Sequence, residues 1–217
     1  MPDARQPVRV TGPRAVTPTS RRARKKQATR QAIYDVAIRL FMERGYDETT
    51  IDDIAGAADV SRATFFNYYA SKPEILHEIA AEALEYARCT FDRNFSRAGD
   101  SIAEKVRRSL RSFAMIVERD PRYYQTVFLD AMRSQAGFVA ANRDAANRLI
   151  NDLTGHMRAA QRAGELNPSL DAGQLAEMLT GIYMYAILSY ILKGCSGSLV
   201  ERIDKAAMIF LEGCQAR

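Results

Sequence analysis

Residues 61–72, with the sequence SRATFFNYYASK, bring a guanidinium, an amide, hydroxyls, aromatic rings and an ammonium into one short stretch. Arginine can bond guanine edges in the DNA major groove, asparagine can bond adenine edges, and apolar groups can contact the thymine methyl. Hydroxyl and ammonium groups suit phosphates, which position a protein without reading sequence. The chemistry that this stretch favours is therefore recognition of double-stranded DNA.

Two short helices joined by a tight turn must hold these side chains. Thr50 and Asp53 have the spacing of a capping box and predict the start of the first helix, and Ser61 can cap the second. Asp59 lies in the turn, and aspartate tolerates a left-handed conformation better than most residues. The apolar residues spaced to pack between the two helices are Ile54, Ala55, Val60 and Phe65. The segment therefore predicts a helix-turn-helix.

Residues 32–76 resemble the tetracycline-repressor (TetR) family of bacterial transcription regulators. The resemblance rests on three motifs in fixed register: AIYDVAIRLFMERGY, TTIDDIAGAADVS and RATFFNYYASKPEIL. It implies that Thr50 contacts phosphate from the start of the first short helix. It places Arg62, Ala63 and Asn67 at base-facing positions. It places Thr64, Tyr68 and Lys72 at phosphate-facing positions, with Phe66 near either the backbone or a thymine methyl.

This sequence departs from the commonest family pattern at three positions. Asp59 stands where glycine is usual in the turn, Ala63 replaces a frequent glycine, and Asn67 replaces an aromatic or larger polar residue. The neighbouring aromatics divide by helical periodicity: Phe65 and Tyr69 are expected in the core, and Tyr68 is expected to touch DNA.

The charge distribution along the chain is uneven. The 217 residues have a net charge of +5, but residues 1–30 hold nine Lys or Arg against one Asp, so the remainder carries a net charge of −3. Residues 1–27 also contain four prolines and no apolar periodicity, which predicts a disordered basic arm. Such an arm is either a solvated tail or a source of phosphate and minor-groove contacts, and the sequence leaves both open.

The rest of the chain shows helical signals and no convincing strand. We expect an all-α fold of about nine helices, with a helix-turn-helix DNA-binding domain at residues 28–74 and a helical domain at residues 75–217. The first helix is expected at residues 29–44 and the fourth at residues 72–95, and a helix opening at Pro121 is expected to present Tyr124, Val127, Phe128 and Met132. The family resemblance implies that the second domain binds small ligands and dimerises.

The segment from residue 172 to about residue 193 is apolar on almost every side, so one face is expected to meet a second chain. Its uncharged stretch of fifteen residues is shorter than the roughly 20 that a bilayer span needs, and a buried helix is expected. A two-fold dimer would match a palindromic operator. The residues predicted at this interface are Leu175, Leu179, Ile182, Ala186, Tyr190, Ile203, Ala207 and Phe210.

An effector pocket is predicted from apolar and aromatic side chains, each of which could equally be plain core. The candidate set has few charges, which favours a hydrophobic ligand. Its members are Phe113, Val117, Tyr124, Phe128, Met132, Leu153, Met157 and Tyr183.

Signals for catalysis or for a metal are weak. His77 begins HEIAA, which lacks the second histidine of a zinc-protease motif, and His156 stands alone on another predicted helix. The three cysteines are odd in number and widely spaced, which argues against a disulfide framework and favours a reducing cytoplasm. We expect no enzyme activity, no cofactor, no metal and no membrane partner.

The interpretation that these features favour is a cytoplasmic, dimeric repressor that a small hydrophobic ligand releases from a palindromic operator. Three alternatives remain open at this point. The first two are an activator and a regulator that acts without a ligand. The third, from another class, is a cytoplasmic small-molecule-binding protein with a vestigial DNA reader.

Overall fold

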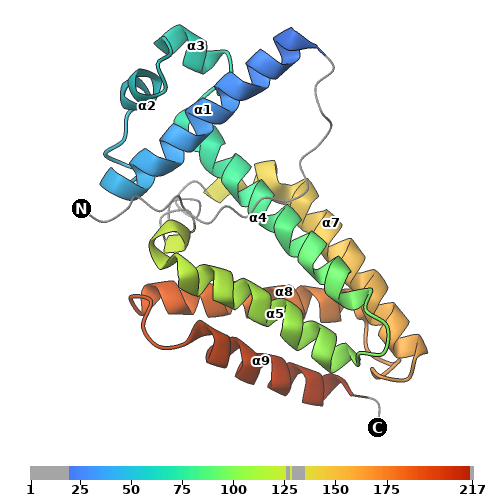
Figure 1. Ribbon diagram of the computed structural model, residues 1–217. Coiled ribbons are helices and arrows are strands. Elements are labelled where there is room, and N and C mark those ends of the chain that lie inside the picture. Colours follow the sequence, from blue (N-terminus) through green and yellow to red (C-terminus); the bar gives the residue numbers. More distant parts are fainter. Residues whose placement is uncertain (1–19, 126–127, 129–134, 216–217) are drawn as a thin grey trace. The chain divides into compact units, whose positions relative to one another are not determined.

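The computed structural model describes residues 20–125, 128 and 135–215 (Figure 1). Among these residues the regular structure is helical, apart from one isolated bridge between Leu166 and Gln215. The all-α prediction is confirmed. The described helices are α1 (Arg21–Arg44), α2 (Ile51–Ala57), α3 (Arg62–Phe66), α4 (Lys72–Phe95), α5 (Ile102–Arg119), α7 (Gln135–Arg162), α8 (Ala172–Leu192) and α9 (Leu199–Cys214).

The helices form two compact units. Of the described residues, the N-terminal unit contains 20–82, 122–125, 128 and 135–142, and the C-terminal unit contains 83–121 and 143–215. Helices α4 and α7 therefore contribute residues to both units. The predicted helix after Pro121 includes Val127 and Met132, which lie outside the described residues.

The first helix begins earlier than its apolar pattern predicts. Helix α1 starts at Arg21 instead of residue 29, because the Ser20 side chain accepts a hydrogen bond from the Ala23 N–H at 3.1 Å. Arginine, lysine, alanine and glutamine are good helix formers, so residues 21–27 extend the helix without apolar spacing. The expectation of a disordered arm reaching residue 27 is wrong for residues 21–27.

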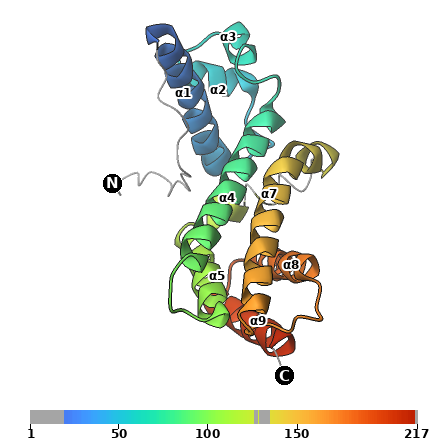
Figure 2. The ribbon, with the colours of Figure 1, turned by 90° about the vertical axis from the view of Figure 1, so that its right-hand side faces the viewer.

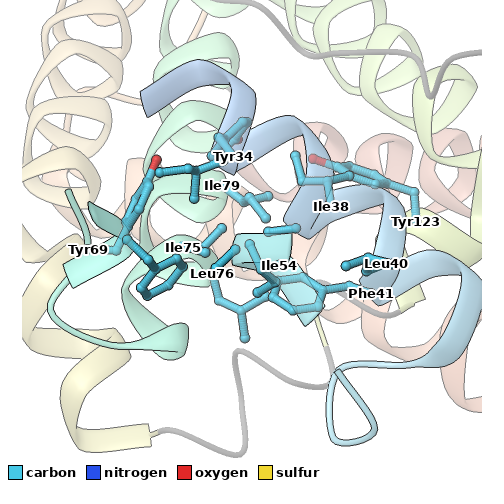
Figure 3. Packing of buried hydrophobic residues seen from close by; sticks show 14 residues of the cluster. Tyr34, Ile38, Leu40, Phe41, Ile54, Tyr69, Ile75, Leu76, Ile79 and Tyr123 are labelled. Atoms are coloured by element: carbon cyan, nitrogen blue, oxygen red, sulfur yellow. The ribbon is translucent and has the colours of Figure 1, made fainter. Parts of the chain in front are cut away.

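One apolar core holds the N-terminal unit together (Figure 3). It joins side chains from α1, α2, α3 and α4 with Tyr123 from the segment after α5. The fully buried members include Ile33, Ile54, Phe65, Ile75 and Leu76. Because every helix of the predicted helix-turn-helix contributes to this core, the position of α3 is fixed by packing from several sides.

The C-terminal unit is built around α5, with α8 and α9 packed against it and against each other. Helix α5 opens with a full capping box of Ser101 and Glu104, as the spacing predicts. Helix α9 opens with Ser198, whose side chain accepts from the Glu201 N–H at 3.2 Å. The Glu118 carboxylate of α5 also accepts from the Val200 N–H at 3.1 Å, which ties the end of α5 to the start of α9.

The predicted dimer residues lie mainly in this core. Leu175, Leu179, Ala186, Tyr190, Ile203, Ala207 and Phe210 are buried within the single chain, and Ile182 is half-buried. Helices α8 and α9 bury these seven against each other and against α5, so they are core residues of the single chain, and a part for them in a dimer interface stays a prediction. The large apolar side chains that stay exposed on the two helices are Met178, Met184, Tyr185, Leu192, Met208 and Ile209.

Helix α8 is long and apolar enough to span a bilayer by length and composition, a property that core helices of soluble proteins share. Its buried face, with Leu175, Leu179 and Ile187, packs in the C-terminal unit as a core helix does. This placement agrees with the buried helix that the sequence predicts.

Candidate nucleic-acid interface

Helix α3 is short, and local hydrogen bonds define both of its ends. Ser61 caps it by accepting from the Thr64 N–H at 3.0 Å. At the other end, the N–H groups of Tyr68 and Tyr69 both donate to the Phe65 carbonyl, at 2.9 and 3.0 Å, so the helical turn continues past Phe66. Phe65 and Tyr69 are buried, as helical periodicity predicts, and they anchor the helix to the core.

The turn before α3 has the conformation expected for a helix-turn-helix. Asp59 adopts a φ of +53°, which confirms the left-handed position that the sequence favours there. The Val60 N–H then donates to the Ala55 carbonyl at 2.9 Å and closes the turn. The turn therefore holds α2 and α3 at a fixed angle without a glycine.

The outward face of α3 presents the residues predicted to read bases. Arg62, Ala63 and Asn67 are exposed, and Phe66 is 44% exposed. Thr64 and Tyr68 are half-buried at the edges of this face, and Tyr68 packs against the core cluster. The structure thus brings six of the eight predicted DNA-binding residues onto one short element.

Arg62 has two contacts that the sequence analysis missed. Its Nη1 lies 2.6 Å from Asp52 Oδ2 of α2, and its guanidinium carbon lies 5.7 Å from the centroid of the Phe66 ring. A carboxylate on one side and a ring face on the other restrict the guanidinium to the outer surface of α3. Asp52 therefore orients the arginine predicted to bond guanine.

Thr50 caps α2 and is exposed. Its Oγ1 accepts from the Asp53 N–H at 3.1 Å, and its own N–H donates to Asp53 Oδ2 at 2.9 Å, so the predicted capping box is confirmed. The Thr50 hydroxyl also donates to the Asp53 carboxylate, and this hydrogen bond first, with the one from the Thr50 N–H second, holds the pKa of Asp53 below its usual value. The phosphate contact of Thr50 stays a prediction.

Lys72 has a different set of contacts from the one its resemblance to the family suggests. Its Nζ donates to the Tyr46 carbonyl at 2.6 Å and to the Thr49 carbonyl at 2.8 Å, and it lies 4.1 Å from the centroid of the Tyr46 ring. The ammonium therefore positions the loop that leads into α2. The phosphate contact predicted for Lys72 stays a prediction.

A polar network between α4, α1 and the end of the helix-turn-helix also supports the position of α3. The sequence analysis missed this network. The Tyr69 hydroxyl donates to Glu78 Oε2 at 2.8 Å, and Arg30 of α1 pairs with the same carboxylate and lies 4.9 Å over the Tyr69 ring. Burial and the neighbouring Glu78 carboxylate raise the pKa of Tyr69. A similar hydrogen bond is donated by the Tyr34 hydroxyl to Glu82 Oε2 at 2.7 Å. The four-residue spacing of the two glutamates, matched by that of Arg30 and Tyr34, is the signal that could have revealed this network.

The predicted effector residues divide between the two units. Phe113, Val117, Leu153 and Met157 are buried in the C-terminal unit. Tyr124 instead packs against the core of the N-terminal unit, and Phe128 belongs to the same unit. Met132 lies outside the described residues. The structure therefore does not gather the whole set into one unit.

The C-terminal unit does contain a cluster of rings, here called the aromatic cluster. Phe113 lies 5.0 Å from Tyr183, 5.4 Å from Phe91 and 6.1 Å from Tyr86, measured between ring centroids. Burial raises the pKa of Tyr183. Phe95 extends the cluster from Phe91. Three of the five rings were not in the predicted set, which includes no residue of α4.

His156 borders the aromatic cluster, with its ring centroid 4.7 Å from that of Phe95. Burial lowers its pKa, and the nearby carboxylates of Asp92 and Asp152 partly oppose this effect. Among the described residues, no group of three or more His, Cys, Asp or Glu side chains could hold a metal ion.

Known proteins resemble this chain both in the reader and in the fold. The family described as "Bacterial regulatory proteins, tetR family" matches residues 33–79. The regulator MftR of Mycobacterium tuberculosis is 48% identical over 56 residues, which span 26% of this chain and 28% of MftR. This chain therefore aligns with less than a third of that relative.

Two solved structures share the fold over most of the chain. The FadR repressor of Thermus thermophilus, in complex with lauroyl-CoA, has a TM-score of 0.68 and 26% identity over 87% of this chain and 96% of that one. The regulator FadR of Bacillus subtilis, in complex with stearoyl-CoA, has a TM-score of 0.72 and 18% identity over 84% of this chain and 98% of that one. Residues 33–79 therefore match the TetR family of bacterial regulatory proteins, and the chain shares its fold with solved structures of TetR-type regulators.

Proposed function

We propose that this protein is a sequence-specific DNA-binding transcriptional regulator whose reading element is α3. The observation that carries the proposal is the division of α3 into two faces. Phe65 and Tyr69 are buried in the core, whereas Arg62, Ala63 and Asn67 are exposed. A rigidly anchored short helix with exposed guanidinium and amide groups is what readout in the major groove requires.

Within this proposal, Thr50, Thr64, Tyr68 and Lys72 position the reader on phosphates, and Phe66 contacts either the backbone or a thymine methyl. Thr50 and Thr64 carry hydroxyls at the starts of α2 and α3, where backbone N–H groups also point outward. Lys72 also acts on DNA binding by holding the loop of residues 46–49, which leads into α2. Asp52 keeps Arg62 on the reading face when DNA is absent.

We further propose that the protein acts as a homodimer through the exposed apolar faces of α8 and α9. Met178, Tyr185 and Leu192 repeat every seven residues on α8, which places them on one face of that helix. Met208 and Ile209 form the corresponding exposed face of α9. Apolar side chains this large and this exposed are typical of a surface that a second copy covers, and a two-fold dimer would read a palindromic operator.

The C-terminal unit is proposed to bind a small hydrophobic effector at the aromatic cluster. The cluster draws Tyr86 and Phe91 from α4, Phe113 from α5 and Tyr183 from α8. The two FadR structures hold acyl-CoA molecules, which fits an apolar ligand here. Because α4 also carries Ile75 and Leu76 in the core of the N-terminal unit, a ligand that favours one arrangement of α4 would change operator binding. We propose a repressor released by its ligand.

The test is fluorescence anisotropy of the full chain against its own upstream DNA and a scrambled duplex of equal length. We expect tight binding to the native duplex alone at about 150 mM salt, where non-specific binding is weak. The Arg62→Ala and Asn67→Ala variants should each lose about 1 to 3 kcal/mol of discrimination at one base position. Arg158→Ala, which alters an exposed arginine of α7 in the C-terminal unit, is the matched control and should bind like the wild type.

Equal binding of both duplexes, with no effect of Arg62→Ala, would contradict the proposal. That result would favour a small-molecule-binding protein with a vestigial reader. For the effector, dodecanoyl-CoA is the first probe, and its addition should release the native duplex if the ligand proposal holds. Tryptophan is absent from the chain, so ligand binding can be followed by tyrosine fluorescence, to which Tyr86 and Tyr183 of the cluster contribute.

A further inference from the structure

The first two turns of α1 carry a dense group of cations, here called the basic turns. Arg21, Arg22, Arg24, Lys25 and Lys26 are all exposed, and the first turn contains no acidic residue. None of the ion pairs found among the described residues involves these five side chains. Five positive charges therefore lie within six residues of a regular helix.

This arrangement is electrostatically unfavourable for the isolated protein. The N-terminal end of a helix carries a partial positive charge, so cations there are repelled by the helix dipole. The pairs Arg21–Lys25 and Arg22–Lys26 also place like charges four residues apart, which weakens a helix. Such an arrangement is relieved when an anionic partner neutralises the charges, and α1 therefore carries a surface suited to a polyanion.

The basic turns lie at the same end of the N-terminal unit as α3, as Figures 1 and 2 both show. Arg30, one turn further along α1, lies 4.9 Å over the ring of Tyr69, which comes three residues after the end of α3. With a rise of 1.5 Å per residue, the basic turns extend from about 6 to about 14 Å beyond Arg30 along the axis of α1. That reach is comparable with the roughly 12 Å width of the DNA major groove.

We propose that the basic turns are a second DNA-contact surface, which binds backbone phosphates of the same duplex just outside the bases that α3 reads. The proposal rests on the proposed function, since it concerns the same bound DNA. Arginine and lysine contacts to phosphate supply affinity without sequence information. Because these side chains already project from a folded helix, their positions relative to α3 are fixed before binding.

The experiment compares the full-length protein with two variants of equal net charge. The first variant replaces the five cations of the basic turns with glutamine. The second is the matched control, which replaces five exposed cations of the C-terminal unit with glutamine: Arg143, Arg158, Arg162, Lys193 and Lys205. Anisotropy is measured against the native duplex at several salt concentrations, and circular dichroism checks that each variant keeps its helix content.

Each phosphate contact contributes about 0.9 to the slope of log affinity against log salt. If three of the five cations reach phosphate, the slope of the first variant should fall by about 2.7 per protomer, with a loss of affinity of at least tenfold at low salt. The slope of the control variant should match that of the wild type. Equal slopes for the two variants would overturn the proposal.

A third variant, Gln27→Pro, tests whether the helix itself matters. Proline is tolerated at the first position of a helix and disfavours helical geometry in the residue before it, so α1 should now begin at residue 27 and keep its buried face. All five cations remain but lose their fixed geometry. We expect weaker binding than in the wild type, and unchanged binding would overturn the preformed helical surface.

Failure of the proposed function would look different. If the wild type did not discriminate the native duplex from the scrambled one, the reader would be refuted. The two five-site variants could still be compared on either duplex, because phosphate contacts do not depend on sequence. A reader that discriminates normally, with equal salt slopes for both variants, would refute the basic turns alone.

Discussion

Two neighbouring residues of α9 allow a sharp test of the dimer surface. Ile209 is 73% exposed, whereas Phe210 is 6% exposed and buried in the core of the C-terminal unit. The same substitution to glutamate at each position should therefore have different consequences. Ile209→Glu should give a folded monomer, and Phe210→Glu should destabilise the fold itself.

The expected magnitudes follow from burial. Truncation of a buried phenylalanine costs about 3 to 5 kcal/mol, and an unpaired carboxylate in the same site adds to that cost. Against a typical total stability of about 5 to 15 kcal/mol, Phe210→Glu should lower the Tm by at least about 6 °C or prevent folding. A surface change such as Ile209→Glu alters monomer stability by about 0.5 kcal/mol or less. If Ile209 is central to the interface, its loss should cost at least about 2 kcal/mol and weaken the dimer about 30-fold.

The assay is sedimentation velocity over a range of concentrations, combined with thermal unfolding of the same samples. Ala159→Glu, an exposed position on α7, is the control for adding a charge to the C-terminal unit. A folded Phe210→Glu monomer would refute the placement of this ring in the core. An Ile209→Glu protein that dimerises like the control would refute the exposed faces of α8 and α9 as the interface.

Three further predictions concern the interior of the two units. Glu78→Gln weakens the bonds from Tyr69 and Arg30 and should cost about 1 to 3 kcal/mol in denaturant unfolding, with an unchanged midpoint contradicting the network. Phe65→Ala should lower the free energy of unfolding by about 3 to 5 kcal/mol and abolish operator binding in anisotropy. Operator binding that survives this substitution would contradict the role of the Phe65 ring in positioning α3. Burial lowers the pKa of His156 in the folded protein below the value of about 6.5 in the unfolded chain. As the pH falls below about 6.5, the unfolded chain therefore binds this proton more readily than the folded protein, and the free energy of unfolding decreases. The wild type should therefore lose more stability than His156→Gln between pH 7.5 and pH 5.5, and equal losses in thermal unfolding would contradict a buried imidazole.

The reader could be predicted almost entirely from the sequence because its signals are local. The capping box of Thr50 and Asp53 and the left-handed turn at Asp59 each depend on a few adjacent residues, and both are present in the structure. The inward positions of Phe65 and Tyr69 follow from a periodicity of 3.6 residues. The partners of Arg62 and Lys72 could not be predicted in the same way. Asp52 and the Tyr46 carbonyl come next to these groups only through the packing of separate helices.

The start of α1 shows a second limit of pattern reasoning. Apolar periodicity marks where a helix is buried, and α1 has no buried residue before Ile33. Its first three turns project beyond the core and are stabilised by the Ser20 cap and by helix-forming residues instead of by packing. A search for apolar faces cannot detect a helical segment that extends beyond the core. The helix-forming residues of that segment and its Ser20 cap can still be recognised in the sequence.

The two faces of α8 show why a core and an interface cannot be separated by hydrophobicity alone. The helix is apolar on almost every side, and this property correctly indicates that more than one neighbour must cover it. It does not indicate which neighbour covers which side. Leu175 and Leu179 are covered by the same chain, while Tyr185, on the face that remains, is 71% exposed. Since both faces use the same kinds of side chain, only the packing within the C-terminal unit separates them, and the residues that the chain leaves uncovered are the ones left for a second copy.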